Sequence, residues 1–407
     1  MTEQPTASRA RNTRLCLRGG MLALALALLL TAARDGNASL AAPSKPPALE
    51  HGGWRIETVD SAGDPAIWTS LALDAAGIPH IAYYLNAGKY AYRNASGWHS
   101  TTFDDMGMDS SLALGSDGYP RIAYRKLNQM NFAYQDASGW HSQFIYGYVN
   151  SYSYCSLALD EEGYPHFSFY DELRVVLDPV IGHLGYAYQD GAGWHTEQVP
   201  DDTLTFRGLY SSIAVDGEGY THISYFHASR QDLKYAYQDG SGWHIETVDS
   251  EGLVGAHTSL ALDDNGYPHI SYFYCGETSY PQCDAYDLKY AYRDTRGWHI
   301  ETVDSAGEAG TYTSLEIDRD GFPHISYWDY GNNDLKYAYQ DAAGWQIQTV
   351  DGQGEDVGQY SSLALGRDGS VHIGYGDDSN GSLKYAYLES ASPEPKPIYL
   401  PVLLKGG

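Results

Sequence analysis

Basic residues are scarce in this chain of 407 residues: 25 Lys and Arg stand against 52 Asp and Glu, a formal net charge of −27. Nucleic acids and anionic lipid surfaces are bound through clustered Lys and Arg, and the only such cluster lies near the N-terminus. We therefore expect no nucleic-acid partner. The acidity fits a strongly hydrated surface, with binding of a cation or a basic ligand as the alternative.

Good helix-forming runs are nearly absent after residue 50, whereas Tyr (37 residues) and Gly (44 residues) are abundant. Aromatic and β-branched residues suit pleated, half-buried surfaces, and Gly suits the turns between them. The length alone allows two domains or one. The composition favours one large all-β domain.

Cysteine is rare as well, with four residues. Cys275 and Cys283 bracket a short insertion, and in an oxidising compartment we expect them to form a disulfide. Closing so short a loop stabilises it by roughly 2–3 kcal/mol on the chain-entropy model. Cys155 is left over, and we interpret it as a small buried residue beside Ser156.

The N-terminus has the order of a secretory signal. Four arginines precede the apolar run 21–30, and small residues follow up to Ala42. The apolar run is too short to favour a stable membrane span, with an uncleaved anchor as the alternative. We therefore expect a signal peptide at 1–42, a linker at 43–51, and a secreted or cell-surface protein whose mature form does not insert into a membrane.

One unit repeats seven times. It runs from Thr258-Ser-Leu-Ala-Leu-Asp263 through Tyr267-Pro-His-Ile-Ser-Tyr272 and Leu288-Lys-Tyr-Ala-Tyr292 to Gly297-Trp-His-Ile-Glu-Thr-Val303. Its serine recurs at Ser70, Ser111, Ser156, Ser212, Ser259, Ser314 and Ser362. Spacings between units run from 41 to 56 residues, about the size of a four-stranded propeller blade. The repeat predicts a seven-bladed β-propeller at 52–390, with four antiparallel strands per blade.

The register of the Gly-Trp segments predicts how the ring closes. The first, at Trp54, precedes any serine unit, and the last unit, which ends at Tyr387, has no Gly-Trp segment after it. We therefore expect the strand 54–59 to pair beside 383–387 as the outer strand of the seventh blade. The residues 391–397 read as a Pro-rich linker. The apolar tail 398–407 is either a sorting signal or a docked strand.

Propeller connectivity predicts the working face. The second-to-third loops and the blade crossings share one face and vary in length, and variable loops on a rigid scaffold often carry function. The residue two before each serine should ring the channel mouth there: Trp68, Asp109, Tyr154, Tyr210, His257, Tyr312 and Tyr360. The second-to-third loops add Tyr84, Tyr170, Asp171, Glu172, His227, Tyr274, Trp328, Asp329, Tyr330, Asp377 and Asp378.

Flat aromatic faces beside carboxylates suit sugar rings. We therefore predict a ligand site; the alternative is that these aromatics only pack neighbouring crossings. The predicted ligand-binding residues are Trp68, Tyr154, Tyr210, His257, Tyr312, Tyr360, Trp328, Asp329, Tyr330, Asp171 and Glu172.

Histidine also recurs once per blade, after the proline or its equivalent, with Arg121 in the remaining blade. Histidines one blade apart are too distant to share a metal, so we expect a structural hydrogen bond to the adjacent blade. The segment 318–321 has no bidentate acid at calcium-loop spacing and reads as a turn. We expect neither a metal site nor a cofactor.

The repeat units resemble those of largely uncharacterised secreted bacterial propellers, which are similar to the sialidase and Asp-box (BNR-like) repeat group. The resemblance covers 52–390. The Asp-box itself, Ser-x-Asp-x-Gly-x-x-Trp, is not matched, because here Asp and Gly are three apart and no Trp closes the turn. Sialidase activity implies three converging arginines and a Tyr/Glu pair. Arg125 and Arg207 are possible loop arginines, but matching blade positions supply no triad.

Three hypotheses follow from the sequence. The first, which we prefer, is an exported non-catalytic monomer that recognises a glycan or an extracellular protein on the variable-loop face. The second is a carbohydrate-active enzyme, either a hydrolase using loop acids such as Asp171, Glu172 and Asp329 or a lyase using Tyr with His227 or His257. The third is a structural surface protein.

Overall fold

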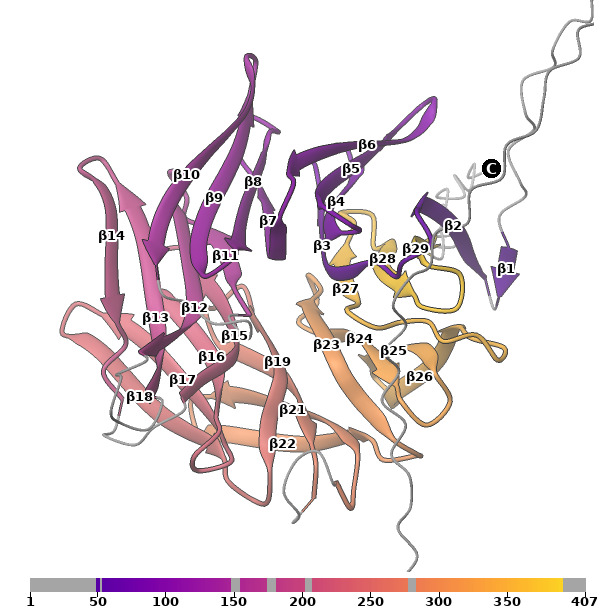
Figure 1. The fold of residues 1–407 in the computed structure, drawn as a ribbon. Helices are drawn as coiled ribbons and strands as arrows, with labels where there is room; N and C mark the ends of the chain where they lie inside the picture. Colours follow the sequence, from indigo (N-terminus) through magenta and orange to yellow (C-terminus); the bar gives the residue numbers. More distant parts are fainter. Residues whose placement is uncertain are drawn as a thin grey trace, which may run out of the picture. The chain divides into compact units, whose positions relative to one another are not determined.

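The computed structural model describes residues 49–51, 53–147, 154–173, 181–201, 207–276 and 283–390. The expected signal peptide, the Pro-rich linker and the apolar tail lie outside the described residues. The described part forms seven antiparallel sheets and contains no helix. In Figure 1 the sheets follow one another around a common centre, from indigo to yellow. This confirms the predicted seven-bladed β-propeller.

Each blade has four strands, numbered outward from the channel. Blade 1 comprises β3 (Ile67–Leu73), β4 (Pro79–Tyr84), β5 (Gly88–Asn94) and β6 (Gly97–Asp104). Blade 2 comprises β7 (Gly107–Leu114), β8 (Pro120–Lys126), β9 (Gln129–Asp136) and β10 (Gly139–Gly147). Blade 3 comprises β11 (Ser156–Leu159), β12 (Pro165–Leu173), β13 (Ile181–Asp190) and β14 (Gly193–Gln198).

The remaining blades repeat this order. Blade 4 comprises β15 (Arg207–Val215), β16 (Thr221–His227), β17 (Asp232–Asp239) and β18 (Gly242–Asp249). Blade 5 comprises β19 (Val254–Leu262), β20 (Pro268–Tyr274), β21 (Asp287–Asp294) and β22 (Gly297–Asp304). Blade 6 comprises β23 (Ala309–Ile317), β24 (Pro323–Asp329), β25 (Asp334–Asp341) and β26 (Gly344–Asp351). Blade 7 comprises β27 (Ser362–Leu365), β28 (Val371–Asp377), β29 (Ser382–Leu388) and β2 (Trp54–Ser61).

Blade 7 confirms the predicted closure. Strand β2 pairs antiparallel with β29, with Arg55 opposite Tyr387 and Asp60 opposite Leu383. The short strand β1 (Leu49–His51) pairs with β2 as a fifth, outermost strand, although we expected this segment to be part of a linker. Because β2 comes from the start of the domain and the other strands from its end, the seam joins the two ends of the ring.

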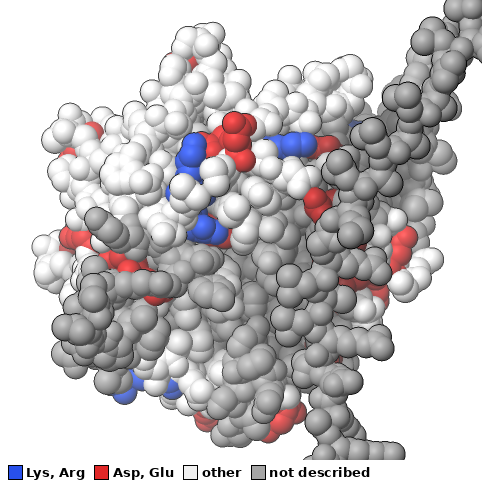
Figure 2. Space-filling view, viewed as in Figure 1, with Lys and Arg blue, Asp and Glu red and all other residues white. Residues whose placement is uncertain are grey.

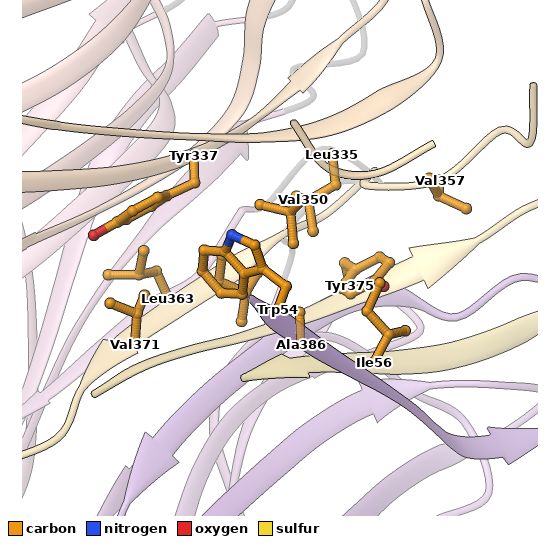
Figure 3. Packing of buried hydrophobic residues seen from close by; sticks show 11 residues of the cluster. Trp54, Ile56, Leu335, Tyr337, Val350, Val357, Leu363, Val371, Tyr375 and Ala386 are labelled. Atoms are coloured by element: carbon orange, nitrogen blue, oxygen red, sulfur yellow. The ribbon is translucent and has the colours of Figure 1, made fainter. Parts of the chain in front are cut away.

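The hydrophobic core lies between the blades, so each core cluster draws on two of them. At the seam, Trp54 is fully buried and packs edge-on against Tyr337 of blade 6, with ring centroids 5.3 Å apart. Figure 3 shows its indole surrounded by Val350, Leu363 and other side chains of the two last blades. The Trp54 indole N–H also donates to Gln348 Oε1 at 3.2 Å.

A ring of hydrogen bonds joins the inner strands. In each blade the repeat serine accepts, through its Oγ, the backbone N–H of the residue after the next blade's serine. The donor–acceptor distances are 2.9–3.2 Å for the pairs Leu71–Ser362, Leu112–Ser70, Leu157–Ser111, Ile213–Ser156, Leu260–Ser212, Leu315–Ser259 and Leu363–Ser314. The first of these bonds crosses the seam, so the ring closes on itself.

The seam predicts the effect of a substitution at Trp54. Truncating a buried Trp to Ala costs about 3–5 kcal/mol, and Trp54→Ala should lower the free energy of unfolding by that amount. Urea denaturation followed by circular dichroism measures the loss. Trp298→Ala, at the equivalent place in blade 5, is the matched variant. If Trp54→Ala were as stable as the unmodified protein while Trp298→Ala was not, the seam would be wrong.

The serine ring predicts a second loss of stability. Ser314→Ala leaves the N–H of the buried Leu363 without its acceptor, which costs about 1–3 kcal/mol. Ser96→Ala, in an exposed turn, is the control and should change the unfolding free energy by less than about 0.5 kcal/mol. Equal stability of the two variants would show that the serine bonds contribute nothing.

Candidate functional site

The seven residues that precede the repeat serines by two positions share an uncommon backbone conformation. All have positive φ: 53° at Trp68, 49° at Asp109, 35° at Tyr154, 54° at Tyr210, 53° at His257, 53° at Tyr312 and 54° at Tyr360. This left-handed region costs an L-residue roughly 1–2 kcal/mol, and such residues cluster at functional sites. We call these seven residues the channel ring.

β-bulges place the channel ring. In five blades the pairing of the first two strands shifts register across this position, for example between Thr311 and Ser314 in blade 6. The crossing before it runs close to the previous blade: at Gly310, with φ of 102°, a Cβ would lie 2.7 Å from Leu288 Cα. A glycine is therefore needed there.

The channel ring lines one cavity of about 220 Å³ at the centre of the propeller, as the sequence predicted. The two following residues of each inner strand complete the lining, and most of them are Ser or Thr. The cavity wall thus has an aromatic layer followed by layers of hydroxyl groups.

Six members of the channel ring are in contact around the cavity. Ring centroids lie 4.2 Å apart for Tyr154–Tyr210, 4.4 Å for Tyr210–His257, 4.6 Å for His257–Tyr312, 4.4 Å for Tyr312–Tyr360 and 6.2 Å for Tyr360–Trp68. The seventh member, Asp109, stands between Trp68 and Tyr154. The aromatic wall therefore has a single polar opening.

Asp109 is held by Arg125, which the second strand of the same blade supplies. The Arg125 Nε donates to Asp109 Oδ2 at 2.5 Å, and its Nη1 donates to the Leu127 carbonyl at 2.8 Å. Both charged side chains are buried. Burial raises the pKa of Asp109, against the opposing effect of Arg125. The opening thus carries one ion pair.

In most blades the residue after the channel-ring member bonds to the preceding blade. Ser110, Ser211, Thr313 and Ser361 donate their hydroxyls to the carbonyl of the channel-ring residue in the preceding blade, at 2.7–3.3 Å. Cys155 occupies this position in blade 3, and its Sγ faces the Asp109 carbonyl. It is half-buried rather than buried, and it replaces a hydroxyl rather than a core methyl. The Sγ atom itself is shielded beside the Asp109 and Ala123 carbonyls, and this desolvation raises the pKa of the thiol.

His257 is the only imidazole in the channel ring. Burial lowers its pKa to about 3. It is therefore neutral at physiological pH, between the rings of Tyr210 and Tyr312.

A second aromatic cluster continues from the channel ring over blades 5 and 6. Tyr312 contacts Trp328 at 6.0 Å between centroids, and Trp328 contacts Tyr330 at 5.3 Å. Tyr330 is 49% exposed and stacks at 5.8 Å and 9° on Tyr286. These four residues lead from the cavity to the surface, which brings the predicted Trp328 and Tyr330 into one site with the channel ring.

The three predicted acids, Asp171, Glu172 and Asp329, are buried and do not line the central cavity. Asp329 is fully buried and forms an ion pair with Lys336 at 2.7 Å. Asp171 and Glu172, in blade 3, are 1% and 7% exposed and do not line the central cavity. Direct contact of these acids with a ligand in the central cavity stays a prediction.

The repeated histidines lie in the second strand and bond within their own blade. In six blades the Nδ1 pairs with the hydroxyl of the third-strand Tyr, for example His222–Tyr235 at 2.5 Å and His324–Tyr337 at 2.5 Å. Our expectation of a bond to the adjacent blade was wrong, because the pleat directs this side chain along its own sheet. In blade 2, Arg121 replaces the histidine, and Phe132, which has no hydroxyl, replaces the third-strand Tyr. The two positions therefore change together.

Other sequence predictions fall outside the channel. The disulfide Cys275–Cys283 is confirmed. The segment 318–321 is a turn in which Asp318 Oδ1 accepts two backbone N–H groups. Within the ranges that the structure describes, no group of three His, Cys, Asp or Glu could hold a metal, and no helix is long and apolar enough to cross a membrane. Figure 2 shows no broad basic patch on the visible described surface.

Comparison with known proteins supports the fold alone. No protein-family model and no curated protein matches the chain. A protein of unknown function from Dyadobacter fermentans matches with a TM-score of 0.51 and 13% identity over 83% of this chain and 100% of its own. A polysaccharide lyase, an ulvan lyase of family PL25, matches with a TM-score of 0.54 and 12% identity over 81% of this chain and 93% of its own. The polysaccharide lyase Uly1 matches with a TM-score of 0.50 and 9% identity over 87% of this chain and 94% of its own.

Sequence reasoning missed two residues of the site. Tyr286 lies three residues after Cys283, which ends the loop that the disulfide closes, and one residue before the third strand; an aromatic beside a bridged loop was the available signal. Arg125 was considered only as a member of an arginine triad. Its place in the second strand of the blade that carries Asp109 could have suggested the ion pair.

The lowered pKa of His257 predicts a pH dependence of stability. In the unfolded state His257 has an ordinary pKa near 6.5, so below that pH it binds a proton that the folded state does not bind. The stability due to neutral His257 is therefore complete above pH 6.5 and is lost as the pH falls towards 3. Between pH 7 and 4 this loss is about 1–3 kcal/mol.

His257→Tyr, which introduces the residue most common in the channel ring, removes this contribution. Urea denaturation at several pH values should show a shallower acid-side decline than in the unmodified protein. The other buried histidines act equally in both proteins, so identical slopes would contradict the burial of His257.

Proposed function

We propose that the protein is a non-catalytic, glycan-binding propeller whose ligand site is the channel ring on the variable-loop face. One observation carries the proposal: six of seven equivalent positions hold a ring side chain in a costly left-handed conformation around one cavity. Packing alone does not require strained backbone at all seven positions. Strain of this kind is typical of sites where side-chain direction matters.

The chemistry of the cavity suits a sugar ring. The C–H faces of a sugar stack on aromatic side chains, and its hydroxyls bond with Ser and Thr hydroxyls and with a carboxylate. The cavity of about 220 Å³ is smaller than the ~300 Å³ at which pockets for drug-sized ligands begin. It therefore fits a single terminal residue, and the cluster Trp328, Tyr330 and Tyr286 offers a surface for the residues that follow.

The electrostatics favour binding over catalysis. A general base works best with a pKa near the operating pH, and His257 has a pKa of about 3. A glycosidase needs two carboxyl groups beside the scissile bond, and among the described lining residues Asp109 is the only acid. That acid is already paired with Arg125.

A carbohydrate-active enzyme is the second candidate. The arrangement of His257 between two tyrosines is the observation that favours a lyase, since such enzymes need a base and an acid on one side of the substrate. Fold similarity to polysaccharide lyases does not by itself carry an activity. A protein ligand and a purely structural role are the remaining alternatives.

We further propose that the protein acts outside the cytoplasm, as a monomer. The disulfide supports this location, because disulfides persist in oxidising compartments. A signal peptide at 1–42 and kinship with the Asp-box group belong to the same proposal and rest on the sequence.

A glycan panel with Tyr312→Asn tests the proposal. Asn tolerates the left-handed conformation, so this variant removes the aromatic face and keeps the backbone. It should weaken binding of any glycan hit at least about tenfold, or ~1.4 kcal/mol, by isothermal titration calorimetry. The control, Tyr164→Asn, lies in a first-to-second turn on the opposite face and should bind like the unmodified protein.

The same glycans are assayed for turnover. If a glycan is turned over and His257→Phe abolishes that turnover, the protein is a lyase or hydrolase and the non-catalytic proposal is wrong. The absence of any glycan hit, or equal affinity in Tyr312→Asn, would contradict a sugar site at the channel ring.

A further inference from the structure

An acidic side chain recurs at the junctions between blades, buried in three of them and partly buried at Asp60 and Asp104. Five outer strands end in an Asp that binds a lysine from the next blade: Asp60–Lys89, Asp104–Lys126, Asp249–Lys289, Asp304–Lys336 and Asp351–Lys384, with N–O distances of 2.8–3.2 Å. The same Asp accepts a hydroxyl from a buried second-strand Tyr, for example Tyr272 to Asp249 at 2.7 Å. These junctions compensate each buried carboxylate with a cation, as burial of charge requires.

Blades 6 and 7 add a second acid to this arrangement. Asp329 and Asp377 end the second strands, are fully buried, and bind Lys336 and Lys384 at 2.7 and 2.9 Å. Asp171 has the same position in blade 3. Asp329 lies two residues after Tyr327, which pairs with Lys336, and Asp171 lies two residues after Phe169, which pairs with Gly185.

Blade 3 keeps this acid but lacks the lysine. Phe169 replaces the second-strand Tyr, and Gly185 stands opposite it where Lys336 stands opposite Tyr327. Tyr146 of blade 2 replaces the outer-strand Asp and donates its hydroxyl to Asp171 Oδ2 at 2.8 Å. Gln198 Nε2 donates to the same oxygen at 3.3 Å.

Among the residues that the structure describes, no lysine or arginine forms an ion pair with the Asp171 carboxylate. Its side chain is 1% exposed, and its Oδ1 is buried with no hydrogen-bond partner. Burial raises its pKa, against the opposing effect of the hydrogen bonds from Tyr146 and Gln198. His183 lies opposite Asp171 in the sheet, but burial and the neighbouring Arg207 lower the pKa of His183, so it is largely neutral.

A cavity of about 220 Å³ lies beside this carboxylate. Its lining includes Tyr146, Phe169, Asp171, Gly185, Glu197 and Gln198. The ring of Phe169 reaches part of the space of the missing side chain, because a Cβ on Gly185 would lie 2.5 Å from Phe169 Cε2. The rest of that space is open.

We propose that this cavity between blades 2 and 3 binds the ammonium group of a primary alkylamine, in the place that a lysine side chain fills in blades 6 and 7. Asp171 supplies the opposite charge, and the Gln198 side-chain oxygen is an acceptor for a second N–H. The rings of Tyr146 and Phe169, which contact each other with centroids 5.2 Å apart, also line the cavity and offer the alkylammonium aromatic surface for cation–π contact.

An organic ammonium fits this cavity better than a metal ion. Ca²⁺ takes six to eight oxygen ligands, and the described residues contain no group of three acids, histidines or cysteines that could hold a metal. The strongly negative chain also concentrates cations near its surface. The site is separate from the channel ring and does not depend on the glycan proposal.

Titration with n-butylammonium chloride, which has the length and charge of a lysine side chain, tests the proposal by isothermal titration calorimetry and thermal melting. We expect saturable binding and a rise in melting temperature, whereas n-butanol and potassium chloride give neither. Asp171→Asn should weaken binding at least about tenfold, since a charge-assisted bond is lost. Asp320→Asn, in an exposed turn, removes the same charge and should bind normally.

The double variant Phe169→Tyr/Gly185→Lys supplies the lysine and tyrosine of the other blades. The aromatic ring at position 169 must turn away from Gly185 to admit the lysine Cβ. The variant should then fold and no longer bind butylammonium, because the lysine occupies the cavity. It also keeps the test valid if Asp171→Asn does not fold. Equal response to butylammonium and butanol, or unchanged binding in the double variant, would overturn the site, as would an absence of binding.

Discussion

The hydrogen bond from a backbone N–H of one inner strand to the serine Oγ of the preceding blade is the contact on which the ring depends. Seven such bonds run round the channel, and one of them crosses the seam from Leu71 to Ser362. An inner strand is the edge of its sheet, and edges present unpaired backbone groups. The serine satisfies one of these groups in each blade and fixes the angle to the next, so the repeat of a single small side chain sets the register of the whole ring.

The channel ring follows from the same geometry. In five blades the strand pairing shifts register just before the serine. In most blades the hydroxyl of the residue before the serine donates to the carbonyl of the channel-ring residue in the preceding blade. The left-handed residue is thereby held by two blades at once. Its side chain is directed over the channel, where aromatic neighbours stabilise one another. Structural repetition thus produces a ring of aromatic side chains around the channel, and the one acidic member, Asp109, makes that ring asymmetric.

Much of the fold could be predicted because it is written in repeats. The count of seven serines, the displaced Gly-Trp at Trp54 and the spacing of the units specify blade number and seam, and the channel ring follows from its offset to the serine. The partners of side chains could not be predicted equally well. The burial of Asp329 depends on Lys336 across the sheet, and the histidines turn to a tyrosine of their own blade. Such choices depend on pleat direction and strand ends, which the repeat alone does not specify.

The seam has a consequence for biogenesis. The strand β2 is made first and its partner β29 last, so no nascent chain can complete the ring until nearly the whole domain has emerged. Contacts between the chain's two ends raise contact order, which slows folding, and partly made blades expose edges that invite aggregation. The seam thus acts as a check on completeness: a chain truncated before its last strand keeps an open edge that quality-control proteases can recognise.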